Sequence, residues 1–244
     1  MTYNLHVEAI NCLLVVLSVQ MYSARTANKS TIYRLVMQKK CAIHALLLTK
    51  GLLTNFVNQR PAPELNGGSI ILGLASGLWN ALTLGYAKGM GDGEKPATLA
   101  RQSLLLLLVL TNHCTTEGNP YREALFNCCD SQVDSQMSLE QTVTGFKIEF
   151  SKLYKTVCVN LSDDRTTLLL YMLLHRNQYF KTFVLSRAVD LDQFVVPILK
   201  ILYTSPDRNS HHIYMALIIL LVLSEDNLFN ESVHDIVSVI QSMI

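Results

Sequence analysis

The sequence predicts an all-α fold, built as an armadillo- or HEAT-like helical repeat (an α-solenoid segment) with a glycine-rich insert. Three observations lead to this prediction. Apolar residues recur at intervals of three and four along most of the chain, no segment of useful length alternates with a period of two, and one pattern of paired helices returns three times. We therefore expect stacked helices whose apolar faces cover one another.

The composition indicates a folded chain with a large core. Of the 244 residues, 50% are apolar and only 16% are charged. A chain this apolar is not disordered, and its length allows a sizeable buried interior. The longest purely apolar runs, 104–110 and 213–223, are shorter than the roughly 18 to 20 residues that span a bilayer. We expect other helices, rather than lipid, to cover these runs.

We divide the chain into three regions of a single domain. Residues 1–60 read as an N-terminal basic pair of helices, at about 5–22 and 30–58, with Leu35 and Ala42 among the apolar residues of the second. Residues 61–98 form an insert rich in glycine and proline that holds an apolar helix, and residues 99–244 hold the repeats.

The repeating pattern is an apolar helix, a polar turn and a second, amphipathic helix. SLLLLLVLTN is followed by NPYREALF, TLLLYMLLHRN by QYFKTFVLSR, and MALIILLVLSEDN by LFNESVHDIV. The interval from Thr167 to Met215 is 48 residues, close to the roughly 40 to 47 of armadillo and HEAT repeats. The interval from Ser103 to Thr167 is 64 residues, which fits if the polar stretch 128–145 is an insertion.

Local signals place the ends of several helices. Asp163 and Asp164 fit the beginning of a helix, where carboxylates interact well with the helix dipole. Pro206, Asp207, Asn209 and Ser210 are suited to form a turn and N-cap for a helix that begins near His211. Asp190 with Gln193 resembles a capping box, and Pro197 falls inside the helix that would follow and should kink it.

The charge distribution marks one end of the chain. The formal net charge is only +1, yet no acidic residue occurs between Glu8 and Glu64. This stretch, which we call the basic block, holds seven basic residues: Arg25, Lys29, Arg34, Lys39, Lys40, Lys50 and Arg60. It is a candidate surface for an anionic membrane or a partner protein, with ordinary solvated helix faces as the alternative. Nucleic acid is disfavoured, because few aromatic residues are interleaved with these charges.

The insert contains an unusual uncharged stretch, residues 65–87. Its small residues lie four apart, as in closely packed helix pairs, and a single tryptophan falls among them: Gly73, Gly77, Trp79 and Gly85. This stretch has three interpretations: a tightly packed or re-entrant protein segment, a segment in shallow contact with a membrane interface, and a true membrane span. An integral membrane protein anchored through residues 65–87 is therefore the alternative to a peripheral one.

The sequence offers no reaction centre. It lacks the G-x-S-x-G and H-E-x-x-H motifs, and we expect neither a cofactor nor a metal nor a small-molecule substrate. His211 and His212 are adjacent and read as capping or surface residues. The cysteines have no metal-ligand spacing, and Cys12 and Cys41 lie in apolar strings, so we expect reduced core thiols.

Several long strings resemble the dymeclin family. They are VEAINCLLVVLS, GLASGLWNALTLG, YREAL, TLLLYMLLHRN and DRNSHHIYMALIILLVLSEDNLFNESVHDIV, and the likeness runs from about residue 7 to residue 237. The resemblance implies a non-enzymatic scaffold on the cytosolic face of the Golgi apparatus, needed for Golgi organisation and vesicle trafficking. It also implies Golgi-associated partner proteins, peripheral contact with the Golgi membrane, and a distribution between cytoplasm and Golgi.

The chain departs from the family at its ends. Family members begin with Met-Gly, which suits N-myristoylation, whereas this chain begins Met1-Thr2-Tyr3. Family members also extend beyond both ends of the matching region. We therefore expect this chain to correspond to a central portion of the family's full length and not to be myristoylated.

Overall fold

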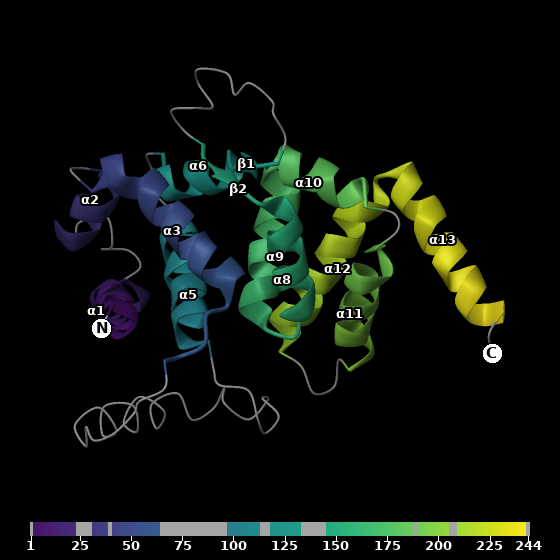
Figure 1. Ribbon diagram of the computed structural model, residues 1–244, viewed down its shortest axis with the longest axis horizontal. Helices are drawn as coiled ribbons and strands as arrows, with labels where there is room; N and C mark the ends of the chain where they lie inside the picture. Colours follow the sequence, from purple (N-terminus) through teal and green to yellow (C-terminus); the bar gives the residue numbers. More distant parts are fainter. Residues whose placement is uncertain are drawn as a thin grey trace.

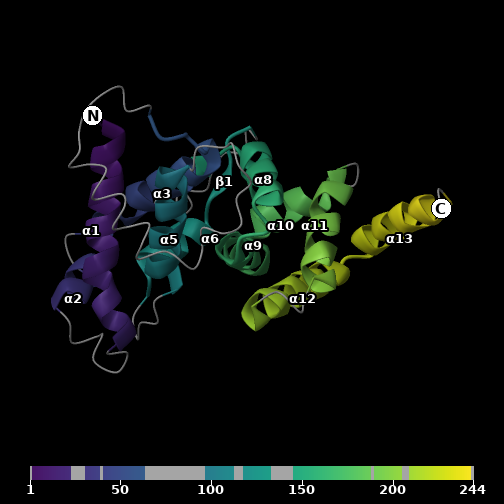
Figure 2. The ribbon, with the colours of Figure 1, turned by 90° about the horizontal axis from the view of Figure 1, so that it is seen from below.

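The computed structural model describes residues 2–22, 31–38, 41–63, 97–112, 118–132, 145–187, 190–204 and 209–242. These residues form eleven α-helices, one short 3₁₀ helix and two strands of two residues each. The helices follow one another in an elongated row, with α1 (Thr2–Tyr22) at one end and α13 (Asn227–Ser242) at the other (Figure 1). Figure 2 shows the same order from below. The prediction of a helical fold is confirmed.

The N-terminal region consists of α1 (Thr2–Tyr22), α2 (Thr31–Gln38), the 3₁₀ helix η2 (Ala42–His44) and α3 (Ala45–Asn58). The prediction of one helix over 30–58 is therefore wrong. Leu35, one of the apolar residues assigned to that helix, is 45% exposed in α2, whereas Met37 is 3% exposed. The 3₁₀ helix η2, which is wound more tightly than an α-helix, immediately precedes α3.

Helix α5 (Thr98–Asn112) lies at the centre of the N-terminal half and packs against α1, α3, α6 and α9. Because neighbours surround it, most of its apolar run is buried, including the side chains of Leu104, Leu106, Leu107, Leu108 and Leu110. The polar groups on this helix are satisfied as well, since the Thr111 hydroxyl donates to the Leu107 carbonyl at 2.8 Å. Protein covers most of the run 104–110, as predicted, whereas the run 213–223 is covered only in part, since Tyr214, Leu217 and Leu221 are exposed.

The remaining helices complete three units of three helices each. The first unit is α3, α5 and α6 (Pro120–Phe126). The second is α8 (Phe150–Val159), α9 (Asp164–Arg176) and α10 (Gln178–Leu185), and the third is α11 (Asp192–Tyr203), α12 (Ser210–Ser224) and α13 (Asn227–Ser242). The predicted pairs α5/α6, α9/α10 and α12/α13 are all present. A further helix, which is not part of the repeating sequence pattern, precedes each pair: α3, α8 and α11.

Corresponding helices of successive units pack on one another. Among the first helices, α8 contacts both α3 and α11, and among the second helices, α9 contacts both α5 and α12. The row α5, α9, α12 follows the long axis of the molecule (Figure 1). A buried aromatic cluster joins α8 to α10 and α11, with Tyr154 and Phe194 stacked at 5.8 Å between ring centroids and Phe150 against Phe180 at 5.2 Å.

The turn inside each unit uses the same local chemistry. A side-chain oxygen of Asn119, Asn177 or Asp226 accepts a hydrogen bond from a backbone N–H in the first turn of α6, α10 or α13. Such a cap satisfies a donor that has no partner within the helix. In that same first turn each unit buries one aromatic ring: Tyr121, Phe180 or Phe229. The three units therefore share a side-chain cap and a buried aromatic residue at the start of their third helix.

Two short strands between α6 and α8 depart from a purely helical structure. β1 (Cys129–Asp130), which lies within the predicted insertion at 128–145, pairs in parallel with β2 (Lys147–Ile148), which follows it. A strand of two residues is too short to show a period of two in the sequence. The pairing also organises α8, because the carboxylate of Asp130 accepts a hydrogen bond from the backbone N–H of Phe150 at 3.2 Å.

The predicted helix ends had mixed outcomes. Asp163 and Asn209 are the N-caps of α9 and α12, as predicted. The capping box at Asp190 is wrong, because the N-cap of α11 is Leu191 and no side chain caps the helix. The Asp190 carboxylate pairs instead with the guanidinium of Arg187. Pro197 does lie inside α11, and its kink stays a prediction.

Candidate partner-binding cleft

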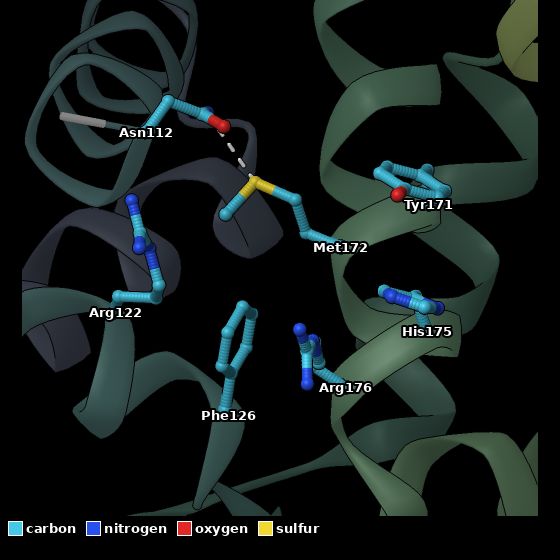
Figure 3. Close-up of a pocket in the computed structure, with 7 residues that line it drawn as sticks. All are labelled: Asn112, Arg122, Phe126, Tyr171, Met172, His175 and Arg176. Carbon is cyan, nitrogen blue, oxygen red and sulfur yellow. Dashed lines mark hydrogen bonds between the residues drawn. The ribbon is translucent and has the colours of Figure 1, made fainter. Parts of the chain in front are cut away.

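A cleft of about 310 Å³ opens between the first and second units, which we call the interunit cleft. Helices α5, α6 and α9 line it, as Figure 3 shows. Among the described residues, the lining consists of Asn112, Arg122, Phe126, Tyr171, Met172, His175 and Arg176. Three of them can carry positive charge, two are aromatic, and none is acidic.

The α5/α6 turn positions one wall of the cleft. The amide of Asn119 accepts hydrogen bonds from two backbone N–H groups of α6 and donates to the Leu110 carbonyl at 2.8 Å, which fixes α6 against the end of α5. Arg122 follows in the first turn of α6, and its Nε donates to the Thr111 carbonyl at 2.7 Å. The guanidinium is thereby held at the C-terminal end of α5, where carbonyl groups favour a cation.

Helix α9 supplies the opposite wall. Met172 is buried and receives a hydrogen bond from the amide of Asn112, with 3.4 Å between Nδ2 and Sδ. One turn further on, His175 stacks on Tyr171 with 5.4 Å between ring centroids and 10° between their planes. His175 and Arg176 are both exposed in the last turn of the helix. The wall therefore changes from apolar to basic toward solvent.

This arrangement can bind a carboxylate next to an apolar group. Figure 3 shows the ring of Phe126 between the side chains of Arg122 and Arg176. An arginine guanidinium matches the two oxygens of a carboxylate, and the methionine and phenylalanine side chains offer an apolar contact between the charges. Nothing in this geometry resembles a catalytic pair of acid and base.

The sequence did not predict this cleft. Its residues lie in the strings YREALF and YMLLHRN, which marked the ends of repeating helices without indicating that those ends meet. Arg122 and Arg176 are 54 positions apart, and stacking of the first two units brings them to one site. One feature of the sequence could have indicated the cleft: both strings hold basic residues close to an aromatic residue.

The structure describes only part of the predicted basic block. Arg34 on α2, Lys50 on α3 and Arg60 beyond the end of α3 are exposed, the first in the described stretch 31–38 and the other two in the stretch 41–63. The other four residues, Arg25, Lys29, Lys39 and Lys40, lie outside the described residues. So do all four residues singled out in the insert, Gly73, Gly77, Trp79 and Gly85. The role of both groups stays a prediction.

His212 contradicts the sequence-based interpretation. It is only 3% exposed, and its Nε2 lies 2.9 Å from the hydroxyl of Thr167 and 3.3 Å from the carbonyl of Leu161. The third position of α12 faces α9 because the two helices pack closely. His211, one residue earlier, is exposed as predicted.

The cysteine prediction is correct for some residues and wrong for others. Cys128 and Cys129 are buried free thiols, and burial raises the pKa of Cys128 well above its usual range. Cys158 is half-buried, and burial raises its pKa to about 11. Cys12 and Cys41, however, are exposed. An apolar string does not determine which of its members points outward, so the neighbours of these two residues were misleading.

Among the residues that the structure describes, no single helix is both long enough and apolar enough to cross a bilayer. One bent pair, Ser210–Ser224 with Asn227–His234, meets the criteria together, with a bend of 109°. Within the same residues no group of three or more His, Cys, Asp or Glu side chains is placed to hold a metal ion. The candidate anchor at 65–87 lies outside them.

Comparison with known proteins identifies relatives over almost the whole chain. The family model described as "Dymeclin: Dyggve-Melchior-Clausen syndrome protein" matches residues 1–243. Dymeclin of Drosophila melanogaster is 44% identical over 253 aligned positions, which cover 96% of this chain and 35% of the relative. Dymeclin of Mus musculus is 42% identical and that of Gallus gallus 41%, each covering 97% of this chain and 38% of the relative.

The alignments cover almost all of this chain but only part of each relative. This chain spans little more than a third of the length of the curated relatives that it matches. No solved structure matches the chain. Because the family model covers all but the last residue and the relatives exceed 40% identity, the chain belongs to the dymeclin family.

Proposed function

We propose that the chain is part of a non-enzymatic scaffold on the cytosolic face of the Golgi apparatus, which supports Golgi organisation and vesicle trafficking by docking partner proteins. The observation that best supports this function is the stacking of corresponding helices in successive three-helix units. Arrays of this kind, of which armadillo and HEAT α-solenoids are the best known, present long surfaces to partners. We infer that this chain is a segment of such a solenoid.

Unpartnered apolar faces on the third unit support a docking role. Val196, Leu199 and Tyr203 are exposed along one face of α11, and Tyr214, Leu217 and Leu221 along one face of α12. Both sets have the spacing of three and four that places side chains on one side of a helix. A further repeat or a partner protein would cover such faces in the assembled molecule.

The exposed members of the basic block support peripheral membrane contact. Each basic residue near an anionic leaflet contributes about 1 kcal/mol, so several together suffice for reversible binding. The test is flotation with vesicles of phosphatidylcholine containing phosphatidylserine at roughly 30 mol%. We expect the chain to float with the vesicles and neutralisation of Lys39, Lys40 and Lys50 to reduce the floated fraction.

A matched control uses three exposed lysines elsewhere, Lys152, Lys155 and Lys200. Replacing them by glutamine removes the same charge, so equal loss of flotation in the two triple variants would contradict a role for the basic block. The cellular test is colocalisation of the tagged chain with a Golgi marker, followed by extraction in alkaline carbonate. Release into the supernatant is expected, whereas retention in the pellet would favour an anchor at residues 65–87.

A further inference from the structure

We propose that the interunit cleft binds a short acidic peptide segment of a partner protein, in which two carboxylates flank one apolar side chain. This inference rests on the proposed scaffold function and deepens it by naming the chemistry of one docking site. It goes beyond the membrane contact, since the cleft lies on α5, α6 and α9 and includes no residue of the basic block.

The first argument is charge complementarity. Arg122, His175 and Arg176 line the cleft, and none of the lining residues that the structure describes is acidic. Arg176 is exposed and makes no ion pair with the residues that the structure describes. Arg122 is oriented by its hydrogen bond to the Thr111 carbonyl. Preorganised guanidinium groups bind carboxylates with little further loss of side-chain entropy.

The second argument is the order of the side chains across the cleft. Phe126 lies between the two arginines, and the buried Met172 faces it from α9 (Figure 3). A ligand that places a carboxylate at each arginine must therefore present something apolar between them. A peptide with the pattern acidic, apolar, acidic satisfies all three positions, whereas a free inorganic anion satisfies only one.

The third argument is size. The cleft encloses about 310 Å³. Sites for small ligands measure roughly 300 to 1,000 Å³, so this cleft accommodates one apolar side chain with its neighbours and not a folded domain. A membrane surface is also disfavoured, because the apolar contacts lie in a recess between two units and not on an exposed helix face. A linear segment is the class of ligand that fits.

The test is fluorescence anisotropy on the 244-residue chain. The probe is the peptide Gly-Glu-Phe-Glu-Gly, blocked at both ends and labelled with an uncharged dye, in about 50 mM salt so that screening is modest. The comparison peptide is Gly-Gln-Phe-Gln-Gly. We expect the acidic peptide to bind at least fivefold more tightly than its amide counterpart.

Two single variants locate the binding. Arg176→Gln should weaken binding of the acidic peptide by about three- to tenfold, as expected for a partly exposed ion pair with a guanidinium. Lys200→Gln removes the same charge from an exposed site on α11 and should change binding less than twofold. Both variants should keep the helical circular dichroism and melting temperature of the original chain, because both side chains are exposed.

Reversal of the charge provides a second readout. Arg176→Glu should weaken the acidic peptide further and tighten binding of Gly-Lys-Phe-Lys-Gly. Equal affinity for the acidic and amide peptides, or equal effects of R176Q and K200Q, would overturn the proposal. So would loss of vesicle flotation in R176Q without any peptide binding, because the cleft would then serve a lipid headgroup.

These experiments distinguish failure of the peptide-binding proposal from failure of the proposed Golgi function. Loss of Golgi localisation with intact, Arg176-dependent peptide binding would reject the Golgi role and leave the acidic-peptide site standing. Golgi localisation without peptide binding would reject the acidic-peptide site and leave the Golgi role standing.

Discussion

Side-chain amides of asparagine residues form hydrogen bonds between neighbouring units of this molecule. Asn177 is fully buried, and its Oδ1 accepts a hydrogen bond from the backbone N–H of Phe180, which begins α10. Its Nδ2 donates to the carbonyls of Leu125 at 3.2 Å and Cys128 at 2.8 Å, which end α6 and lead into β1. An amide can accept and donate in this way, whereas a carboxylate can only accept.

Replacement of Asn177 by alanine should lower the free energy of unfolding by about 2 to 4 kcal/mol. The cap contributes about 1 kcal/mol, and two buried carbonyls lose a donor. Urea denaturation measures the effect, with Asn209→Ala as the control because that cap is exposed and should cost only about 0.5 to 1 kcal/mol.

Asn177→Asp tests the donor half of this argument. It keeps the capping oxygen and places a carboxylate beside two carbonyl oxygens, so it should be at least as destabilising as the alanine variant. Stability near that of the original chain would show that the bonds to Leu125 and Cys128 contribute little.

The carboxyl group of Asp163 makes the stability of the folded chain depend on pH. Burial acts to raise the pKa of its carboxyl, but the hydrogen bonds and the charge of Arg165 outweigh burial and lower the pKa below its ordinary value. The two groups form an ion pair at 2.6 Å. A carboxyl with a lowered pKa stabilises the folded state above its unfolded pKa, and this contribution disappears as the pH falls through the folded pKa.

Asp163→Asn should therefore cost about 1 kcal/mol at neutral pH and nothing in strong acid. Asparagine remains a good N-cap, so the variant isolates the charge. Thermal melts between neutral pH and about pH 2 follow the difference between the two proteins. The neighbouring variant Asp164→Asn should leave most of the acid dependence in place, and a difference for D163N that does not vary with pH would refute the assignment.

At the scale of elements, a buried polar contact fixes α12 against α9. Thr167 is fully buried, and its hydroxyl donates to the Leu161 carbonyl at 3.1 Å and contacts Nε2 of His212 at 2.9 Å. The contact lies near the N-terminal ends of both helices. It therefore holds the second and third units in one relative position, in addition to the apolar contacts along the helices.

Thr167→Val should weaken this junction by about 1 to 3 kcal/mol, because it keeps the shape of the side chain and leaves a buried imidazole without one partner. Thr167→Ser retains the hydroxyl and should recover much of the loss. Chemical denaturation of both variants gives the comparison. Equal loss in the valine and serine variants would mean that packing of the methyl group, and not the hydrogen bond, is responsible.

At the scale of the whole molecule, the units depend on their neighbours. Helix α9 packs against α5, α6, α8, α10 and α12, whereas α13 packs chiefly against α12. In arrays of repeats, stability is approximately the sum of the intrinsic unit terms and the contacts between adjacent units. An element with one principal neighbour should open more often than an element with five.

Hydrogen exchange measured by mass spectrometry should accordingly show the strongest amide protection in α5 and α9 and the weakest in α13. The graded order reflects local opening rather than global unfolding. Thr167→Val should accelerate exchange in α12 and α13 and leave α5 close to its original rate. Uniform protection across all helices would indicate a single cooperative unit.

Most helices could be predicted because a helix is specified locally. The spacing of three and four gave α1, α5, α9 and α12, and short polar residues gave the caps of α9 and α12. Prediction failed where the deciding interaction came from elsewhere in the chain. The pairing of β1 with β2 and the burial of His212 each depend on a partner distant in sequence.

The sequence by itself determined the helical class, the three recurring helix pairs and the family, since all of these are read from neighbouring residues or from ordered strings. The tertiary structure alone decided which face of each helix is buried, and it brought Arg122 and Arg176 to one cleft. The physical reason is that periodicity defines an apolar stripe but not the helix that covers it. Stacking of the units makes that choice, and the cleft forms where the ends of α5 and α6 meet α9.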